Sequence, residues 1–168
     1  MGATVKITPR IAAQVARRLR LAASIRSSSM SRLVNDALHK LGVKTIVVLS
    51  PYMSNAPIIE YLAAAGIGVA KDVALQCKTP AEFEAVTPQR WLELAQENDT
   101  PDADGIFLSC TNTTQIEAVA AIEAALGKPV VNSNQAVLWG CLERLKDKLG
   151  DTGAAPKNLG RLMNGLGT

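Results

Sequence analysis

The chain has 168 residues, of which 48% are hydrophobic and 20% charged, and its formal net charge is +3. This length and composition are typical of a globular domain with a substantial hydrophobic core. Glu117 and Glu123 interrupt the longest apolar stretch, so we predict no membrane-spanning segment, and the arginine-rich N-terminus does not follow the pattern of a secretory signal.

The cysteine and histidine content bounds the chemistry further. Cys77, Cys110 and Cys141 are odd in number, widely spaced and without a CxxC pair, which argues against a disulfide framework and against a structural zinc site. We therefore predict a cytoplasmic protein without a bound metal. His39 is the single histidine and lies within a helical pattern, so we assign it no catalytic role.

The first forty residues form a basic segment. They hold eight Lys or Arg against one acidic residue, a net charge of +7, whereas the remainder holds ten basic and fourteen acidic residues, a net charge of −4. Within residues 1–40, TVKIT predicts a short strand, and PRIAAQVARRLRLAA and MSRLVNDALHKL predict two helices. We interpret residues 1–40 as a basic helical segment.

This segment allows an interpretation of another class. A strand followed by two helices with clustered arginines resembles a ribbon-helix-helix DNA-binding module, and the positive charge of residues 4–40 suits phosphate contacts. A DNA-binding or regulatory protein is therefore an alternative. Since the second helical pattern continues into the next strand without a linker, and a solvated helix face explains the arginines equally well, we do not expect nucleic acid as a partner.

From Lys44 onward, short apolar runs alternate with helical patterns, which predicts a parallel α/β sheet with right-handed crossovers. The predicted strands are Thr45–Ser50, Ile67–Cys77, Gly105–Ser109 and Lys128–Ser133. The predicted helices are Ala56–Ala65, two that start at Thr79-Pro80 and Thr87-Pro88, Thr113–Leu126 and Gln135–Leu149. The Gly-rich tail, residues 150–168, is expected to be irregular with one turn near Leu159–Met163.

Small and polar residues follow three of these strands, in the segments 50–52, 109–112 and 132–134. Ligands of such sheets bind beyond the carboxyl ends of the strands, so we expect these segments to lie on one edge and to form a site. Cys110 occupies the turn from strand to helix. The N–H groups and positive dipole of a helix N-terminus favour a thiolate and can bind a carboxylate. A cysteine packed in the core is the alternative.

Three motifs resemble one enzyme family. SCTN at a strand end, GKPVVNSNQA, and LGVKTIVVLSPY resemble the aspartate/glutamate racemase superfamily, in the branch of maleate cis-trans isomerases and arylmalonate decarboxylases. The resemblance covers roughly Ser31 to Leu145. It implies a flavodoxin-like parallel sheet, with one complete lobe of a two-lobe racemase-like fold plus part of the other. Residues 1–40 would be a remnant of the first lobe, 41–133 the second lobe, and 134–168 a helix and tail that return to the first.

The resemblance also implies a function and a site. It implies a cofactor-independent, cysteine-dependent isomerase of a small dicarboxylic acid, similar to maleate isomerase, with an arylmalonate-type decarboxylase or an amino-acid racemase as alternatives. The family's catalytic cysteine falls on Cys110, its carboxylate-contacting tyrosine on Tyr52, and its loop amides on Thr111 and Asn112. Asn134 matches the SNQ motif, for which we infer a structural role at the lobe junction. By position, Asn55 is expected to cap the helix that follows it.

The resemblance has two gaps. Family members begin with a further strand, an Asn-containing loop and a second cysteine or its replacement, and we find no counterpart of these here. An asparagine expected near residues 79–82 also has no match. We therefore predict weak or no isomerase and racemase activity for the chain alone. We also predict exposed apolar surface, and hence a homo-oligomer.

Overall fold

A computed structural model describes residues 30–149 and 158–164, without the side chains of 145–149. Its elements, in chain order, are α2 (Met30–Lys40), β1 (Thr45–Ser50), α3 (Ala56–Ala64), β2 (Gly68–Ala74), α4 (Pro80–Ala85), α5 (Pro88–Asn98), β3 (Gly105–Leu108), α6 (Gln115–Leu126), β4 (Val130–Asn132), α7 (Ser133–Leu149) and the short 3₁₀ helix η1 (Arg161–Met163). The strand and first helix predicted before residue 24 lie outside the described residues.

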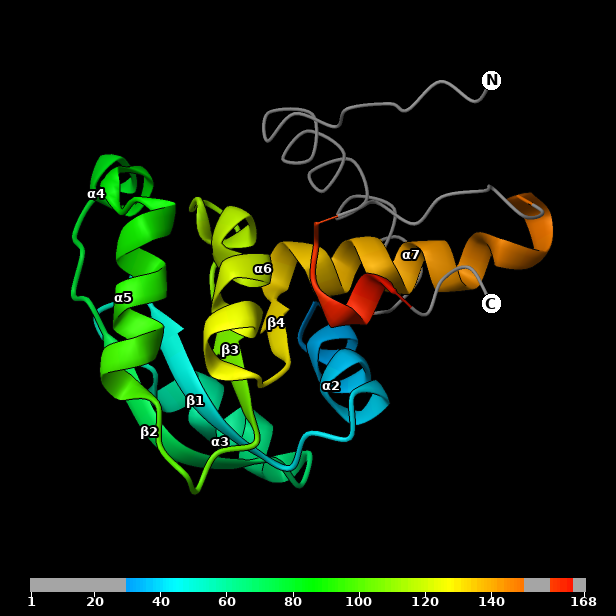
Figure 1. The fold of residues 1–168 in the computed structure, drawn as a ribbon, viewed down its shortest axis with the longest axis horizontal. Helices are drawn as coiled ribbons and strands as arrows, with labels where there is room; N and C mark the ends of the chain where they lie inside the picture. Colours follow the sequence, from blue (N-terminus) through cyan, green and yellow to red (C-terminus); the bar gives the residue numbers. More distant parts are fainter. Residues whose placement is uncertain (1–29, 150–157, 165–168) are drawn as a thin grey trace.

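The four strands of the described part form one parallel sheet in the order β2-β1-β3-β4 (Figure 1), as predicted. β1 and β3 occupy the centre. From Ile46 to Ser50 every residue of β1 is buried, which explains its continuous β-branched and aliphatic sequence, because a central strand of a covered parallel sheet packs on both faces. The predicted α/β class with a flavodoxin-like sheet is confirmed.

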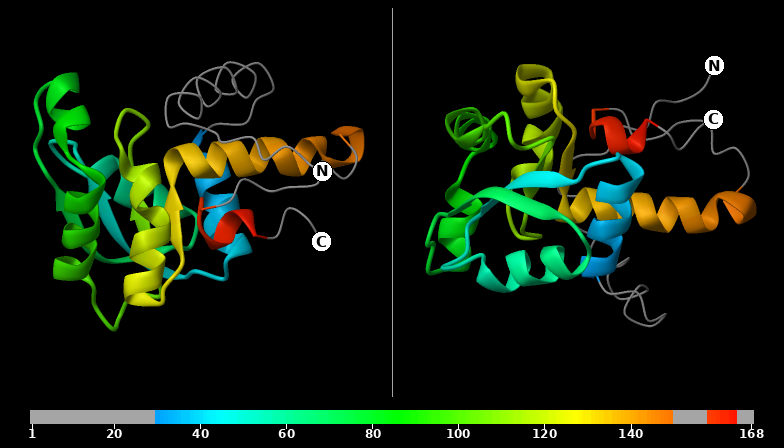
Figure 2. Two further views of the ribbon diagram at one scale, coloured as in Figure 1. Left: turned by 45° about the horizontal axis from the view of Figure 1, so that its top comes forward. Right: turned by 90° about the horizontal axis from the view of Figure 1, so that it is seen from below.

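Helices cover both faces of the sheet (Figure 2). Successive side chains of a strand point to opposite faces, so Ile46 and Val48 of β1 belong to a core cluster with α2, α3, α7 and η1. Val47 and Leu49 belong to a second cluster, with α5 and α6. The two clusters are the two hydrophobic layers of a three-layer α/β/α arrangement.

Helices α2 and α7 pack directly on each other. A Cβ atom at Gly140 of α7 would lie 2.5 Å from a methyl carbon of Leu33 of α2, so a larger residue here would force the Leu33 side chain to move. The tail closes over the same region, where Leu162 and Met163 of η1 are buried in the core. The predicted turn near Leu159–Met163 is thus confirmed, and these helices find partners within the chain.

Thr-Pro pairs start two helices as predicted. The Thr79 hydroxyl accepts a hydrogen bond from the Glu82 N–H (3.3 Å), and Thr87 accepts one from Arg90 (3.1 Å). In each case Pro follows at the first helical position, where its fixed φ suits the helix and no N–H is lost. Within the described residues, no helix is both long enough and apolar enough to cross a membrane.

Helix α3 is the apolar exception on the surface. It is rich in apolar residues, yet Leu62 is its one buried residue, and Tyr61 is 39% exposed. Exposed apolar surface of this kind favours association, so the predicted homo-oligomer stays a prediction. We expect sedimentation at low micromolar concentration to show a dimer or larger species, because burying such surface removes it from water. A stable monomer would contradict this expectation.

Candidate active site

The segments that follow three strands meet at the carboxyl edge of the sheet. The strand register pairs Leu49 with Leu108, and Leu108 with Asn132. The segments that follow β1, β3 and β4 therefore leave the sheet at one edge, as the sequence predicted. They contain Tyr52, Cys110 and Asn134 respectively.

Cys110 lies in the loop after β3, and its side chain is only 4% exposed. The backbone N–H of Asn112 donates a hydrogen bond to Cys110 Sγ at 3.3 Å. Helix α6 begins at Gln115, two residues later than predicted, so residues 111–114 form a bent loop between the cysteine and the helix. The amide that contacts the sulfur therefore belongs to this loop and not to the first helical turn.

Tyr52 meets Cys110 across the edge of the sheet, and its hydroxyl interacts with the side chains of Cys110 and Ser109. Burial raises the pKa of the Tyr52 hydroxyl well above its usual range, the negative charge and hydrogen bonding of Cys110 raise it further, and a hydrogen bond with Ser109 offsets part of this. Tyr52 therefore keeps its proton at neutral pH and can donate a hydrogen bond to an anion. The structure thus brings together two predicted site residues from different loops.

The turn that carries Tyr52 is held by Asn55, which lies at the predicted N-cap position but does not cap the helix with its side chain. Its Oδ1 accepts from Ser50 Oγ at 2.5 Å and its Nδ2 donates to Asp72 at 3.4 Å. The Ser50 hydroxyl also accepts from the Tyr52 N–H at 3.2 Å. Since the Asn55 amide is engaged by β1 and β2, it fixes the Tyr52 turn instead of capping the helix.

The Tyr52 ring is held from its other side by α4. The rings of Tyr52 and Phe83 pack edge to face, with centroids 6.0 Å apart and an interplanar angle of 71°. Aromatic pairs in this geometry are worth about 0.5–1.5 kcal/mol beyond their buried area. Phe83 was not singled out in the sequence, because nothing local indicates that α4 packs against the loop after β1.

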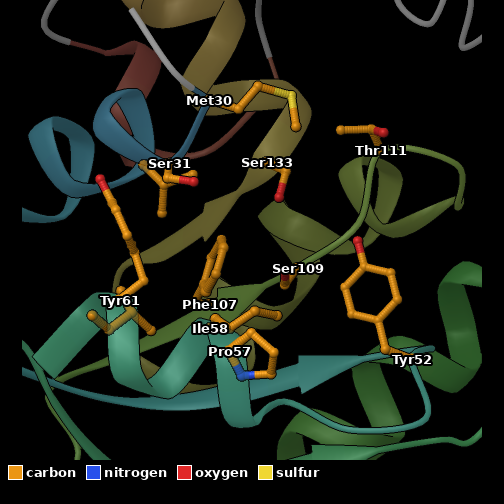
Figure 3. Close-up of a pocket in the computed structure, with 12 residues that line it drawn as sticks. Met30, Ser31, Tyr52, Pro57, Ile58, Tyr61, Phe107, Ser109, Thr111 and Ser133 are labelled. Atoms are coloured by element: carbon orange, nitrogen blue, oxygen red, sulfur yellow. The ribbon is translucent and has the colours of Figure 1, made fainter.

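A cavity of about 360 Å³ opens beside these residues, and Tyr52, Ser109 and Thr111 line it. Figure 3 shows the Tyr52 hydroxyl directed toward the loop that carries Ser109 and Thr111. Cys110 and Asn112 do not line the cavity themselves. The full lining is Met30, Ser31, Val34, Tyr52, Pro57, Ile58, Tyr61, Leu62, Phe107, Ser109, Thr111 and Ser133.

The cavity lining combines hydroxyl groups with apolar side chains. Hydroxyl groups of Tyr52, Ser109 and Thr111 come from the loops after β1 and β3, and that of Ser133 from the start of α7. Helices α2 and α3 and strand β3 supply aliphatic and aromatic side chains, together with the hydroxyls of Ser31 and Tyr61. The twelve lining residues carry no formal charge. A carboxylate bound here would be held by neutral hydrogen-bond donors, which are effective where water is excluded. Ser133 belongs to the segment 132–134 that the sequence placed at this edge, although no individual role was assigned to it.

The other candidate side chains lie elsewhere. Burial raises the pKa of the Cys77 thiol above its usual value, and the Glu82 carboxylate adds to this effect. Burial likewise raises the pKa of Cys141, against a partly opposing effect of Arg144. His39 is exposed on α2. Cys77, Cys141 and His39 are absent from the cavity lining, as is Cys110, so Cys110 is distinguished by its contacts with Asn112 and Tyr52. The described residues contain no His/Cys/Asp/Glu cluster able to hold a metal ion.

The contact between Tyr52 and Cys110 gives a pH prediction. Because the folded protein holds the Tyr52 proton more tightly than the unfolded chain, stability is unaffected below the ordinary tyrosine pKa of about 10 and falls above it. In a pH titration followed by tyrosinate absorbance, the contribution of Tyr52 is the part that is missing in Tyr52→Phe. We expect this part to appear above pH 10. Cys110→Ala should lower that midpoint, since Cys110 contributes to the shift. Cys141→Ala serves as the control, and an equal effect of both variants would contradict the contact.

The parallel α/β fold, with a cysteine and a tyrosine in contact at the carboxyl edge of its sheet, can be compared with known enzyme families. The model of the arylmalonate decarboxylase family matches residues 8–162, and the chain belongs to this family. It is 29% identical over 141 residues to a maleate isomerase of Geobacillus stearothermophilus, covering 82% of this chain and 54% of that protein. It is 27% identical over 125 residues to an arylmalonate decarboxylase of Bordetella bronchiseptica, covering 72% and 52%.

Solved structures agree with this assignment. A crystal structure of arylmalonate decarboxylase superposes with a TM-score of 0.71 at 26% identity, covering 90% of this chain and 67% of that one. A maleate cis-trans isomerase of Nocardia farcinica, solved as a cysteine-to-serine mutant with a covalently bound succinylcysteine intermediate, has the same fold, with a TM-score of 0.69 at 20% identity and coverage of 89% and 62%. The chain spans about half the length of the curated relatives it matches.

Proposed function

We propose that the protein acts on a small carboxylic acid without a cofactor, with Cys110 as the reacting group. The observation that carries this proposal is the position of Cys110 at the sheet edge, where its Sγ accepts a hydrogen bond from the Asn112 N–H and its side chain interacts with Tyr52. The thiolate is the reactive form of cysteine, and in the proposed role these two groups would face the sulfur. Neutral donors of the adjoining cavity, Tyr52 and Thr111 among them, would hold the substrate carboxylate.

The first candidate reaction is maleate isomerisation. The Cys110 thiolate would add to one alkene carbon, forming a C–S bond while the π electrons move to the other carbon and its carboxylate. Rotation about the new single bond would follow. The electron pair would then re-form the double bond, expel the thiolate and leave fumarate, with no net redox change or proton uptake. The name of the Geobacillus relative and the succinylcysteine of the Nocardia enzyme support this candidate.

The second candidate is decarboxylation of a malonate that carries an apolar group, and the cavity lining favours it. Ile58, Leu62 and Phe107 offer an apolar surface next to the hydroxyl groups. One carboxylate would be held by the donors while the other leaves as CO₂ and its bonding electrons stay on carbon. The Cys110 thiol would protonate that carbon and regain a proton from water. This reaction requires one cysteine, whereas racemisation requires acid–base groups on both faces of the substrate.

Proton NMR in deuterated water distinguishes the candidates. We expect phenylmalonate to lose CO₂ slowly in the presence of the wild-type chain, and maleate, aspartate and glutamate to react weakly or not at all. The physical reason is that maleate must be held at two carboxylates during rotation, whereas the predicted carboxylate contacts, Tyr52 and the loop after Cys110, lie together at the sheet edge. Rapid formation of fumarate would favour the first candidate, slow Cys110-dependent loss of CO₂ from phenylmalonate would favour the second, and turnover that survives Cys110→Ser would contradict both.

A further inference from the structure

The junction between β4 and α7 is polar and yet fully enclosed. Asn132 and Gln135 have no exposed surface, and Ser133 and Asn134 are 6% and 7% exposed. Burying side-chain amides costs free energy unless they form hydrogen bonds. The partners of these amides therefore indicate what the junction holds in place.

Asn132 connects three elements. Its side-chain Nδ2 donates to the Leu108 carbonyl at the end of β3 and to Gln115 Oε1 at the start of α6, both at 3.2 Å. Its Oδ1 accepts from the backbone N–H groups of Asn134 (2.9 Å) and Gln135 (3.3 Å) in the first turn of α7. The Asn132 side chain thus donates two hydrogen bonds and accepts two. Two of its partners, Leu108 and Gln115, flank the Cys110 loop.

Asn134 holds the middle of the same loop. Its side-chain Nδ2 donates to the carbonyl oxygen of Thr111 at 3.2 Å. Leu108 precedes Cys110, Thr111 follows it directly, and Gln115 ends the loop. The β4–α7 junction thus restrains the loop before, within and after its bend, close to the amide of Asn112 that contacts the sulfur.

The junction is itself anchored at its far side. Gln135 Oε1 accepts from the Asn132 N–H at 3.0 Å, and Gln135 Nε2 donates to the Leu159 carbonyl. Glu123 of α6 accepts from the N–H groups of Val130 (3.0 Å) and Arg161 (2.8 Å). The amides that face the Cys110 loop are therefore attached to a rigid frame of β4, α6 and the tail.

We propose that Asn132 and Asn134 are positioning residues that hold the Cys110 loop, so that the Asn112 N–H remains directed at the sulfur and Thr111 remains at the cavity. The proposal rests on the proposed role of Cys110 for its meaning in catalysis. Its geometric content does not depend on any reaction. In this proposal, residues 132–134 position the Cys110 loop in addition to connecting β4 to α7.

Alkylation of the three thiols in one sample tests this role without a substrate. Because Cys110 is 4% exposed, iodoacetamide reaches it when the loop opens, and its rate reports the open population. Asn134→Ala and the similarly sized Asn134→Leu both remove the donor to Thr111 without adding charge. Loss of one such hydrogen bond should accelerate alkylation of Cys110 about 3- to 10-fold, while Cys77 and Cys141 in the same digest keep their wild-type rates.

Asn98 provides the matched control. Its Nδ2 donates to the Leu94 carbonyl at 2.9 Å at the end of α5, away from the site. Asn98→Ala and Asn98→Leu should leave the Cys110 rate unchanged. Backbone amide exchange should rise at Asn112 in the Asn134 variants and not in the Asn98 variants. An unchanged Cys110 rate in both Asn134 variants, or an equal acceleration of all three thiols, would overturn the proposal. Failure of every substrate with wild-type protein, by contrast, would overturn only the proposed function.

Discussion

Replacing Cys110 by serine is expected to lower turnover of any accepted acid by about 10³-fold or more. The serine hydroxyl is far less acidic than a thiol and does not supply the anion that addition to an alkene requires. It is also a weaker proton donor to a carbanion. The side chain is buried and differs by one atom of similar size, so the fold should persist. Initial rates with the best substrate from the NMR screen measure the effect.

Cys77→Ser and Cys141→Ser are the matched controls for this experiment. Both residues are partly exposed free thiols outside the cavity lining, and burial raises the pKa of each. We expect both variants to retain wild-type rates. If either control variant loses as much activity as Cys110→Ser, the assignment of the chemistry to Cys110 would be contradicted.

The parts of the fold that were predicted correctly depend on local signals. The strand Thr45–Ser50 was found at its observed bounds because a short β-branched run suits a strand buried on both faces. The starts at Thr79 and Thr87 were found because a Thr cap and a following Pro act within one helical turn. These elements carry their determinants within a few residues.

The errors arise where distant residues decide the local structure. The helix predicted from Thr113 begins at Gln115, because the Thr114 hydroxyl donates to the Val86 carbonyl at 2.7 Å and Asn134 binds the Thr111 carbonyl. Helix α7 starts at Ser133, two residues before the predicted start, because the Asn132 side chain accepts the N–H groups that follow. An Asn before a helix is a recognisable N-cap signal, so this second error was avoidable.

The site was predictable to a different degree at each residue. The shared sheet edge followed from the topology and the individual roles of Tyr52 and Cys110 from the family resemblance. The contact between these two side chains was not predicted, since residues 58 positions apart give no local reason for it. The apolar wall contributed by α3 was not predicted. Its residues formed an ordinary helical pattern, and only the packing of α3 beside the sheet edge turns them toward the cavity.

Replacing Tyr52 by phenylalanine is expected to lower kcat about 10²- to 10³-fold, the usual loss when one donor to a developing anion is removed. The ring and its edge-to-face contact with Phe83 remain, so packing changes little. The lost group is the hydroxyl that interacts with Cys110 and Ser109. Because its raised pKa keeps this hydroxyl protonated across the neutral range, the defect should be equally large throughout that range.

Tyr61→Phe makes the same chemical change at a second tyrosine of the same cavity. Tyr61 belongs to α3, is 39% exposed and is absent from the interactions of Cys110. We therefore expect Tyr61→Phe to lower activity much less than Tyr52→Phe and to act mainly by raising KM, because the Tyr61 hydroxyl can contact a bound acid without contacting the reacting sulfur. A larger defect in Tyr61→Phe than in Tyr52→Phe would place the reacting carbon near α3, and the carboxylate contact would then have to be reassigned to that side of the cavity.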